Sequence, residues 1–513
     1  MTWKVGVHLK TKSIMLAGLV TALAAGAFGC SKGPAAADGD KSAAAAGNDG
    51  KKTLQVEIIR PGSNLPTPDK DVIKQEMDKA LGASYNMTVY ASLDDYKNQL
   101  NVRLTAGNYP DLFLVDRQML SQYVKQNLVL DLDKYKDKLK PALDFIGDAA
   151  KNGMIDGKLY AISHTQQKPM QSFFIRKDWL DRLGLKPPAN LEELKAVAKA
   201  FTEKDPDGNG KQDTIGITGS KLETFQPVFG AFNIAMPGSF VVKDGKVTNS
   251  LFDPAMKDAL SYIQGLIQDK VVDPELLGNT GMQHQQKAIM GQAGIIYIDW
   301  ANLTKEQIME QIKTVNPKAE WIPLTPPAGP GGQWNGTWDI GTSPYIFSIP
   351  KALEKNPDKL QKVFDLINYV ANQQTGGLLV QYGVKGKHYN MEGDKIVPTE
   401  LMGKEVGYSW LYQFTGRPEI KYLQSKFASQ APYIDFYNKQ PRIEALNGFV
   451  TLPEGFNKTD VDRYVEEEFA KFIYGKRSLQ EYDSFANTLK TTMNYQAYLD
   501  AAQKQLKQMG YGN

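Results

Sequence analysis

Hydrophobic and polar positions follow two alternating periods from residue 53 onward. Residues 54–59 form an apolar strand run, and residues 69–81 have the spacing of an amphipathic helix. This strand–helix pair is repeated, with a strand predicted at residues 87–90 and a helix at residues 93–106. The apolar run at residues 112–115 predicts a buried strand. This order of strands and helices predicts a parallel sheet covered by helices, whose ligands bind beyond the carboxyl ends of the strands.

The same alternation continues in the rest of the chain. Asn190 predicts a helix N-cap, with Glu193 in the capping-box position and apolar residues on one face of the helix that follows. Further strands are predicted at residues 294–299 and 345–349, and further helices from residue 357 and within residues 461–509. A chain of 513 residues is long enough for roughly two to four domains, so we expect an α/β protein with more than one core.

The first thirty residues have the layout of a secretion signal. Three lysines precede an apolar stretch over residues 14–28, which is shorter than the roughly 20 residues of a membrane span. The stretch ends in AFGC at Cys30, which resembles the bacterial lipobox, where small residues precede a cysteine that is lipidated and becomes the mature N-terminus. We therefore predict a signal peptide at residues 1–29 and a lipid anchor on Cys30. A plain signal peptide cleaved nearby is the alternative.

The segment after Cys30 is predicted to be a flexible tether over residues 30–52. Residues 31–52 contain no aromatic and no large aliphatic side chain, so they cannot bury enough apolar surface to offset the entropy of ordering. No later stretch reaches 18 apolar residues. We therefore expect a folded body held at the extracellular face of the cell membrane by its lipid anchor.

Charge and cysteine content exclude several classes of protein. Lys4, Lys10 and Lys12 lie in a segment without acids and account for the net charge of +3, so the chain from residue 30 onward is neutral. A neutral body argues against strong electrostatic capture of nucleic acid. The single cysteine, Cys30, excludes disulfides within the chain, and four histidines leave little room for a histidine-rich metal site.

Several motifs occur in an order that is found in one known family. They are, in chain order, AGNYPDLFLVD at residues 106–116, DGKLYAI at 156–162, FFIRKDWLDRLGLKPPANLEEL at 173–194, DPDGNGKQDTIG at 205–216, IDW at 298–300 and YGVKGKHY at 382–389. Together with the lipobox, they make the chain resemble the extracellular solute-binding proteins of bacterial ABC importers. It is most similar to the family 1 carbohydrate-binding lipoproteins, which include the alginate-oligosaccharide receptors.

The resemblance implies a two-lobe, periplasmic-binding-protein-like α/β fold, with a hinge between the lobes and a ligand cleft at their interface. We expect lobe one to comprise residues 53–163 and 340–400, and lobe two to comprise residues 164–339 and 401–513. The implied function is that of a membrane-tethered receptor that captures an oligosaccharide by hinge closure and delivers it to the transmembrane subunits of an ABC permease. We expect a monomer without catalytic activity.

Residues 205–213 have the spacing of an EF-hand-like calcium loop. Its predicted Ca²⁺ ligands, at alternate positions of the loop, are Asp205, Asp207, Asn209, the backbone carbonyl of Lys211, and Asp213. Gly210 allows the sharp turn at position 6, whereas Gly216 stands at position 12 in place of the usual bidentate glutamate. We expect the ion to stabilise the loop rather than to bind the ligand. A polar loop held by Asx turns is the alternative.

Sugars present apolar faces and many hydroxyl groups, so a cleft for them needs aromatic platforms beside acids and amides. Side chains of these types follow predicted strands or lie near the predicted lobe crossings. The predicted ligand-binding residues are Asp116, Gln166, Asp299, Trp300, Trp334, Trp338, Tyr408 and Trp410. Asp299 and Trp300 match the Asp-Trp cleft motif of the family. A uronate ligand would also need cations in the cleft, for which Arg60, Arg117, Lys168 and Arg417 are available.

Two other functions stay open at this point. A receptor for a peptide or another small solute would share the two lobes and use the aromatic residues differently. A tethered polysaccharide-degrading enzyme would need an acid/base pair of carboxylates, and no pair stands out in the sequence. The chain also has no GxSxG, no HExxH and no P-loop motif. Turnover of a polysaccharide substrate would separate the enzyme from a binding protein.

Overall fold

The strand–helix alternation predicted from residue 54 onward is present in the computed structural model, which describes residues 53–512. The predicted signal peptide, Cys30 and the tether lie outside the described residues. Local signals explain where the elements begin. Asn190 caps its helix, as predicted, and Asn356 caps the helix predicted from residue 357, because each side chain accepts a hydrogen bond from a backbone N–H in the first turn.

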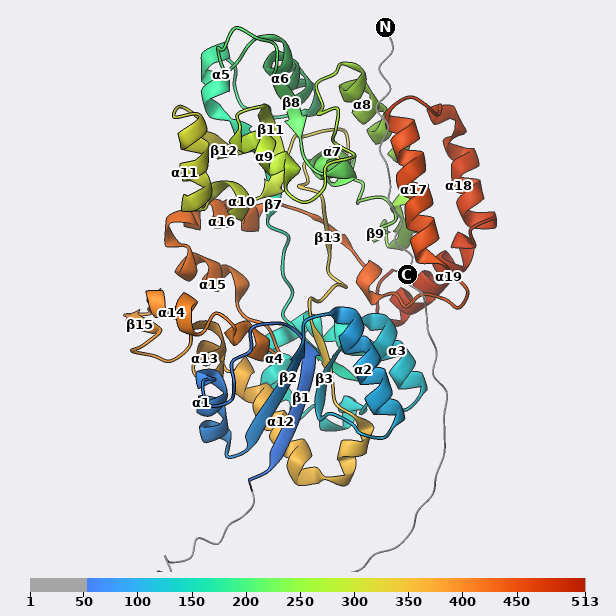
Figure 1. The fold of residues 1–513 in the computed structure, drawn as a ribbon. Helices are drawn as coiled ribbons and strands as arrows, with labels where there is room; N and C mark the ends of the chain where they lie inside the picture. Colours follow the sequence, from blue (N-terminus) through green and yellow to red (C-terminus); the bar gives the residue numbers. More distant parts are fainter. Residues whose placement is uncertain (1–52, 513) are drawn as a thin grey trace, which may run out of the picture. The chain divides into compact units, whose positions relative to one another are not determined.

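The first sheet combines the predicted parallel strands with two strands from elsewhere in the chain (Figure 1). In spatial order its strands are β2 (Ser84–Tyr90), β1 (Gln55–Pro61), β3 (Leu112–Val115), β14 (Ile346–Ser348) and β6 (Ala161–Ser163). Strands β1, β2 and β3 are parallel, and β14 runs antiparallel to both of its neighbours. The late strand β14 therefore inserts between strands that precede it by more than 180 residues.

Helices from two distant parts of the chain complete the first lobe. They are α1 (Val72–Leu81), α2 (Leu93–Thr105), α3 (Arg117–Lys125), α4 (Lys140–Ile146), α12 (Pro357–Ala371), α13 (Gly376–Tyr382) and α14 (Glu400–Glu405), followed by the hairpin of β15 (Tyr389–Glu392) and β16 (Lys395–Pro398). Helix α12 buries Val363, Phe364 and Ile367 on one face. One hydrophobic core holds these elements together, so we define the first lobe as residues 54–163 and 345–422.

The second sheet is built from the strands β12 (Trp321–Pro323), β7 (Gln171–Arg176), β11 (Ala293–Asp299) and β8 (Ile215–Thr218), in that order. Strands β11 and β8 are parallel, whereas β7 is antiparallel to both of its neighbours. Successive side chains of β7 enter different cores, because Phe173 packs on one face of the sheet and Phe174 on the other. Both faces of this sheet are therefore covered.

Helices surround the second sheet, and the last three form a red group at one side in Figure 1. They are α5 (Lys177–Leu183), α6 (Leu191–Glu203), α7 (Gln226–Ala231), α8 (Met256–Gln268), α9 (Gln283–Ile289), α10 (Ala301–Thr304), α11 (Glu306–Val315), α16 (Ala431–Lys439), α17 (Lys458–Ile473), α18 (Tyr482–Thr491) and α19 (Tyr495–Gln508). A hairpin of β9 (Phe240–Lys243) and β10 (Lys246–Asn249) joins them. We define the second lobe as residues 171–340 and 431–512.

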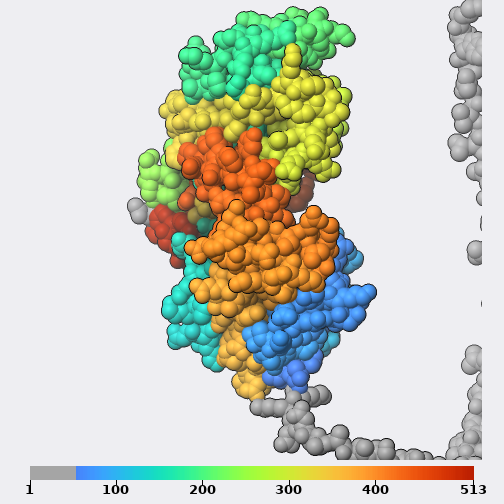
Figure 2. Space-filling model, turned by 90° about the vertical axis from the view of Figure 1, so that its left-hand side faces the viewer, coloured from blue at the N-terminus to red at the C-terminus, as the bar shows by residue number. Residues whose placement is uncertain are grey.

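Three chain segments cross between the lobes. The first joins β6 to β7, and the second leads from β13 (Thr337–Asp339) to β14. The third runs through α15 (Glu419–Lys426) to α16 and β17 (Ile443–Ala445), and it lies on the face seen in Figure 2, where the orange segment covers the junction. Strands β13 and β17 pair in parallel, so the second and third crossings are joined to each other.

The third crossing lies later in the chain than residue 400, where the sequence analysis placed it. The side chains of Met402, Leu411 and Tyr422 are buried in the first core, and Ile434 is the first hydrophobic residue of the returning segment that is buried in a core of the second lobe. The boundary differs from the prediction because residues 402–422 bury large side chains against the first lobe. No helix among residues 53–512 combines the length and the apolar character that crossing a membrane requires.

Candidate functional site

The edges of the two sheets that carry strand carboxyl ends are joined by the crossing segments. In the first lobe β1, β3 and β6 end at one edge, and the second crossing enters β14 at the same edge. In the second lobe β8 and β11 end at the edge where β7 begins, since Asp299 pairs with Gln171. The crossing from β6 to β7 connects these edges directly. In both sheets, the edge at which α/β proteins bind ligands therefore faces the junction.

A cavity of about 460 Å³ lies at the first-lobe edge of this junction. The ends of β1 and β3, the start of α3 and the second crossing form its walls. Its lining residues are Pro61, Leu93, Tyr96, Lys97, Leu114, Val115, Asp116, Arg117, Met119, Gly341, Thr342, Ser343, Pro344, Tyr345, Ile346 and Gly448. Aromatic rings, hydroxyl groups and charges are thus gathered in a space of the size used by small ligands, and we call it the junction cavity.

Asp116 is the predicted site residue that lines the junction cavity, and it also begins α3. Its carboxylate accepts a hydrogen bond of 2.8 Å from the backbone N–H of Met119 and pairs with Lys97 Nζ at 2.8 Å. The next residue, Arg117, donates from Nη1 to the carbonyl of Met154 at 2.6 Å. Burial lowers the pKa of Arg117 to about 10, which leaves it positively charged at neutral pH.

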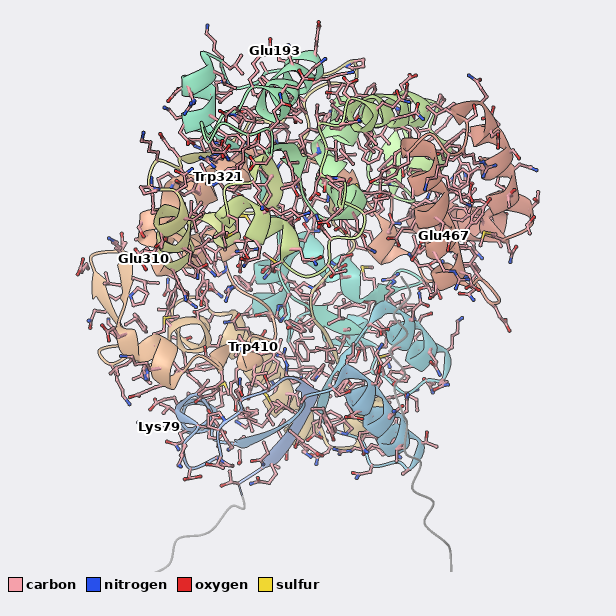
Figure 3. The ribbon with its side chains drawn as sticks, turned by 45° about the horizontal axis from the view of Figure 1, so that its top comes forward. Lys79, Glu193, Glu310, Trp321, Trp410 and Glu467 are labelled. Atoms are coloured by element: carbon pink, nitrogen blue, oxygen red, sulfur yellow. The ribbon has the colours of Figure 1, made fainter. Side chains whose placement is uncertain are left out.

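Trp410 lies beside the junction cavity, as part of an aromatic pair. Its ring stacks on that of Tyr345, with 6.2 Å between ring centroids and 28° between ring planes. Arg60 lies against both rings, with its Cζ 4.5 Å from the centroid of Tyr345 and 5.1 Å from that of Trp410. Figure 3 shows Trp410 above the first sheet, on the side of the second lobe. Both rings are half-buried, so they form an aromatic wall at the junction.

The structure places Tyr408 differently from the prediction, in the first core rather than at the junction. Only 7% of its surface is exposed, and its hydroxyl donates to Asp71 Oδ1 at 2.9 Å. Tyr412 donates to the other oxygen of the same carboxylate, which also caps α1 through the N–H of Lys74. Tyr408 therefore fastens the third crossing segment to the first lobe and cannot stack on a ligand in this structure.

Asp299 and Trp300 also separate, although they are neighbours in sequence. Asp299 ends β11 at the junction edge, and its carboxylate accepts from the N–H of Ala301 at 2.9 Å. Burial raises its pKa. Trp300 is only 3% exposed and packs edge-to-face on Phe427, with 5.5 Å between centroids. Both residues were predicted to bind the ligand, but only Asp299 lies at the edge of the sheet. The side chain of Trp300 is buried in a core of the second lobe.

Of the remaining predicted residues, Gln166 and Trp338 lie on crossing segments and Trp334 just precedes the second crossing. Gln166 donates from Nε2 to the carbonyl of Ile340 at 3.0 Å, which ties the first crossing to the second. Trp338 belongs to β13 and packs half-buried on the second core. Trp334 lies earlier in the chain, with its Nε1 donating to the carbonyl of Gly331 at 3.3 Å. These residues are gathered at the second-lobe side of the junction, and they do not line the junction cavity.

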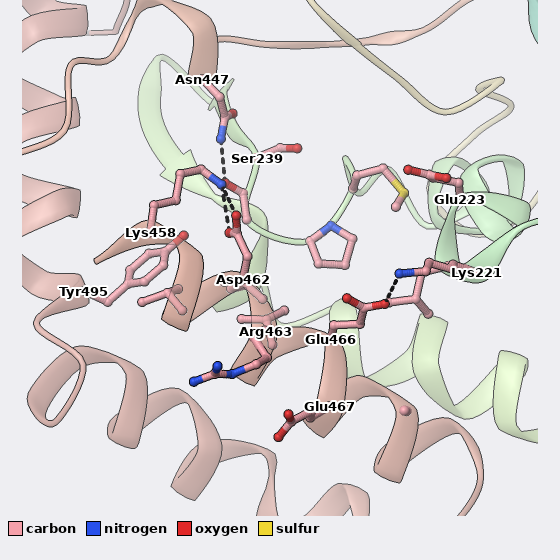
Figure 4. A pocket seen from close by; sticks show the side chains of 18 of the residues that line it. Lys221, Glu223, Ser239, Asn447, Lys458, Asp462, Arg463, Glu466, Glu467 and Tyr495 are labelled. Atoms are coloured by element: carbon pink, nitrogen blue, oxygen red, sulfur yellow. Dashed lines mark hydrogen bonds and ion pairs between the residues drawn. The ribbon is translucent and has the colours of Figure 1, made fainter. Parts of the chain in front are cut away.

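A larger cavity of about 680 Å³, which the sequence analysis missed, lies in the second lobe between α17 and residues 221–239 (Figure 4). Apolar side chains, among them Phe456, and charged side chains both line it. Lys221 pairs there with Glu466 at 2.6 Å. Asn447 lines this cavity and Gly448 lines the junction cavity, so two adjacent residues contribute to the two cavities. No local motif could reveal it, because its walls come from segments more than 200 residues apart.

The predicted calcium loop brings its polar side chains together. The side-chain amide of Asn209 donates to Asp207 at 3.0 Å and to Asp213 at 3.1 Å, while Asp205 accepts the backbone N–H of Asn209 at 3.0 Å. Within residues 53–512, no group of three or more Asp, Glu, His or Cys side chains is arranged as a metal site. The donors fit a hard cation by their chemistry, since three carboxylates surround one amide. Position 12, Gly216, lies in β8 and offers no side chain.

Comparison with known families gives a match over most of the described chain. Residues 74–375 match the family described as bacterial extracellular solute-binding protein. The polygalacturonan/rhamnogalacturonan-binding protein YtcQ of Bacillus subtilis is 29% identical over 349 residues, which cover 64% of this chain and 65% of YtcQ. This chain thus spans just under two thirds of the length of YtcQ. The fructooligosaccharide ABC transporter substrate-binding protein FusA of Streptococcus pneumoniae is 25% identical over 475 residues, covering 83% of this chain and 84% of FusA.

Solved structures with the same fold cover nearly all of the described chain. An HMO-binding, ABC-transporter-associated solute-binding protein from Bifidobacterium longum infantis has a TM-score of 0.68 and 18% identity, over 90% of this chain and 100% of its own. The alginate-binding protein AlgQ2, crystallised without calcium ion, has a TM-score of 0.62 and 20% identity, over 89% and 98%. A FusA EF-hand mutant in complex with fructo-nystose has a TM-score of 0.60 and 19% identity, over 90% and 99%. The expected two-lobe α/β fold is confirmed.

Proposed function

The chain belongs to the bacterial extracellular solute-binding proteins, and from this premise we propose that it captures an oligosaccharide at the junction between its lobes for uptake by an ABC importer. The observation that carries the proposal is the junction cavity, with the stacked rings of Tyr345 and Trp410 beside it at the carboxyl ends of the first sheet. The ligands named for YtcQ and FusA are carbohydrates, which supports a sugar as ligand.

Each part of the junction has a role in sugar binding. The ring of Tyr345 offers an apolar face to the CH groups of a pyranose or furanose, and Trp410 holds that ring in place from behind. Thr342 and Ser343 supply hydroxyl groups, while Asp116 and Arg117 supply charge-assisted hydrogen bonds. These groups are held on strand ends and on the second crossing, so their positions are set by the sheet.

Closure of the two lobes would convert binding into a signal for the transporter. The three crossings are short compared with the lobes, and β13 and β17 pair within them, so a rigid-body rotation of the lobes needs few backbone changes. A ligand that contacts both lobes favours the closed state by its differential affinity. We propose that the closed, liganded form docks as a monomer onto the transmembrane subunits of the permease, and we assign no catalytic residue.

Anchoring at the outer membrane face is part of the proposal. The lipobox-like sequence at Cys30 supports a lipid anchor, and the 22 residues that follow it up to residue 52 would keep the folded body clear of the bilayer. Such an anchor keeps the receptor near its permease. It accords with the extracellular location that the family description gives.

We further propose a structural Ca²⁺ at residues 205–213. Asp205, Asp207, Asn209 and Asp213 would supply side-chain oxygens, and Lys211 its backbone carbonyl. Asn209 would need to present its amide oxygen in place of the nitrogen that now faces the carboxylates. A bound Ca²⁺ supplies positive charge that neutralises the clustered carboxylates. The loop follows α6 and precedes β8, so the ion would stabilise the second lobe and touch no ligand.

Calorimetric titration of the purified full-length protein with oligosaccharides tests the proposed function. We expect one class of sugar to bind and Tyr345→Ala to weaken that binding. Tyr474→Ala is the matched control, because Tyr474 is an exposed tyrosine beyond the end of α17. Binding of peptides, with no heat from any sugar, would favour the alternative receptor and overturn the proposal.

A further inference from the structure

Three arginines at the junction form no ion pair with a carboxylate of the described residues, and of these Arg60 and Arg442 are buried and Arg117 is half-buried. Arg60 is fully buried, and its hydrogen bonds go to the carbonyls of Leu411 at 2.6 Å and Pro61 at 3.3 Å. Its second terminal nitrogen, Nη2, has no hydrogen-bond partner within the described residues. Arg60 lies against the ring of Tyr345, which lines the junction cavity. The charge of Arg60 is therefore compensated only by backbone carbonyl oxygens and by the faces of aromatic rings.

Arg117 repeats this arrangement on the wall of the junction cavity itself. Its Nη1 donates to the carbonyls of Met154 and Asn152, and its Nε is buried with no partner in the part of the chain that the structure describes. Asp116, next to it, is engaged by Lys97 and by the first turn of α3. Asp156 acts on Arg117 electrostatically but forms no ion pair with it, so the guanidinium can still attract a carboxylate of a ligand in the cavity.

Arg442 adds a third charge from the second-lobe side of the junction. Its terminal nitrogens donate to the carbonyls of Asn335 and Gln171, and its Nε has no partner among residues 53–512. Lys168, on the first crossing, adds a further positive charge near Arg442, and its Nζ donates to the carbonyl of Asn438 at 2.9 Å. Both lobes thus contribute cations to one junction that form no ion pair within the described residues, although Glu444 acts on Lys168 electrostatically.

Every other arginine that is buried or half-buried within residues 53–512 pairs with a carboxylate, which sets Arg60, Arg117 and Arg442 apart. Arg176 pairs with Asp178 at 2.6 Å, and Arg417, which the sequence also offered as a cleft cation, pairs with Glu419 at 2.6 Å. The carboxylates at the junction are already occupied by backbone amides. Asp299 accepts from Ala301, and Asp339 accepts from Gly341 and Gly448. None of these carboxylates forms an ion pair with Arg60, Arg117 or Arg442, and a ligand carboxylate can supply that partner.

We propose that the ligand is an acidic oligosaccharide whose uronate carboxylate lodges against Arg117 in the junction cavity, with Arg60 and Arg442 adding long-range attraction from either lobe. This inference rests on the proposed function and specifies the chemical class of its substrate. A sugar ring stacked on Tyr345 would place its carboxylate among these cations. A neutral sugar would leave the buried charges uncompensated, so it binds more weakly.

Calorimetric titration of the full-length protein with matched trisaccharides tests the charge of the ligand. The acidic arm uses trigalacturonate, trimannuronate and triguluronate, and the neutral arm uses the methyl ester of each together with galactotriose. We expect at least one acid to bind, its methyl ester to bind at least tenfold more weakly, and the affinity for the acid to fall as sodium chloride is raised. Equal affinity for the acid and its ester overturns the inference and leaves the receptor proposal standing.

Two arginine variants assign the effect to the cavity. We expect Arg117→Gln to weaken binding of the acid at least tenfold and binding of its ester by a clearly smaller factor, and Arg117→Lys to retain most of the affinity for the acid. Arg182→Gln is the control, because Arg182 lies on the exposed face of α5, far from the junction (Figure 1). An unchanged affinity of Arg117→Gln for the acid overturns the assignment. Absence of binding by every acidic and neutral sugar overturns both the inference and the proposed function.

Discussion

Tyr345, at the end of the second crossing, and Trp410, in the first-lobe segment that leads to the third crossing, stack on each other at 6.2 Å between ring centroids, with the guanidinium of Arg60 against both rings. The pair therefore belongs to both the first core and the junction. Because Tyr345 precedes β14 directly and lines the junction cavity, any movement of the second crossing changes the surface presented to a ligand. This relationship links closure of the lobes to ligand contact.

Removing either ring of this pair is expected to weaken sugar binding. Stacked aromatic contacts contribute about 0.5–1.5 kcal/mol beyond the area they bury, so Tyr345→Ala and Trp410→Ala should each lose about tenfold in affinity. Trp410→Ala acts indirectly, by freeing the ring of Tyr345. Calorimetric titration measures the loss, with Tyr474→Ala as the control. If both variants bind as tightly as wild type, the aromatic wall is not the sugar platform.

Tyr408 should behave in the opposite way, although it lies two residues before Trp410. Tyr408→Phe removes one hydrogen bond to the buried carboxylate of Asp71, which should lower the free energy of unfolding by about 1–2 kcal/mol. Ligand affinity should not change, because the hydroxyl points into the first core. Urea unfolding and titration of the same sample check both statements. A loss of ligand affinity without a loss of stability would show that Tyr408 contributes to ligand binding.

Local patterns predicted the elements well, and long-range packing limited the prediction of the site. The caps at Asn190 and Asn356 and the first three strands depend on neighbouring residues, so the sequence contains them. The insertion of β14 between β3 and β6 depends on residues more than 180 positions apart. That insertion brings Tyr345 to the carboxyl end of β3, and no local signal marks it.

The same reasoning explains the site residues that the structure places elsewhere. Trp300 and Trp410 both follow polar, loop-like positions in the sequence. In the structure Phe427 packs over Trp300, whereas Trp410 stays half-exposed at the junction. Burial of an aromatic residue depends on what packs over it. Asp116 was predictable because an acid directly after a buried strand stands at the sheet edge whatever the rest of the chain does.

The buried His164 should make stability depend on pH. Burial, followed by the charge of Arg60, lowers the pKa of His164 to about 3, so the folded protein keeps this ring neutral. The unfolded chain binds a proton near pH 6.5, and folded stability is therefore lost as the pH falls from about 6.5 toward 3, by about 1.4 kcal/mol per pH unit.

The variant His164→Phe isolates this contribution, because phenylalanine keeps the contacts of the ring with Tyr345 and Phe347. The difference in unfolding free energy between wild type and variant should be constant above pH 7.5 and should shift in favour of the variant below pH 6. Denaturant unfolding between pH 4 and 8 measures it. Parallel curves over the whole range would show that His164 titrates normally in the folded protein.

The calcium loop predicts a dependence of stability on divalent ions. Ca²⁺ at one hundred times its Kd should stabilise the protein by about 2.7 kcal/mol, and EDTA should lower the Tm accordingly. Asp207→Asn should reduce this response, whereas Asp244→Asn, in the exposed turn after β9, should not. Sugar affinity should change little in either case. Superimposable melting curves with EDTA and with Ca²⁺ would remove the proposed site.

Close packing of two glycines constrains the second and third crossings. A Cβ atom on Gly448 would lie 2.1 Å from the carbonyl carbon and oxygen of Gly341, so Gly448→Ala must separate these two crossings. We expect a loss of about 1–3 kcal/mol in stability and a lower ligand affinity, because both glycines line the junction cavity. Gly403→Ala is the control, since nothing lies within 4 Å of its added Cβ. Wild-type affinity in Gly448→Ala would show that this contact does not shape the site.

The most direct test of the account is a titration of the wild-type protein and Tyr345→Ala with acidic and neutral oligosaccharides under the same conditions. The account predicts saturable binding of a sugar by wild type, weakened about tenfold in Tyr345→Ala, with a melting temperature of the variant that shows it is folded. Sugar binding that Tyr345→Ala leaves unchanged, or no sugar binding at all by wild type, would contradict the claim that the junction between the lobes is an oligosaccharide site.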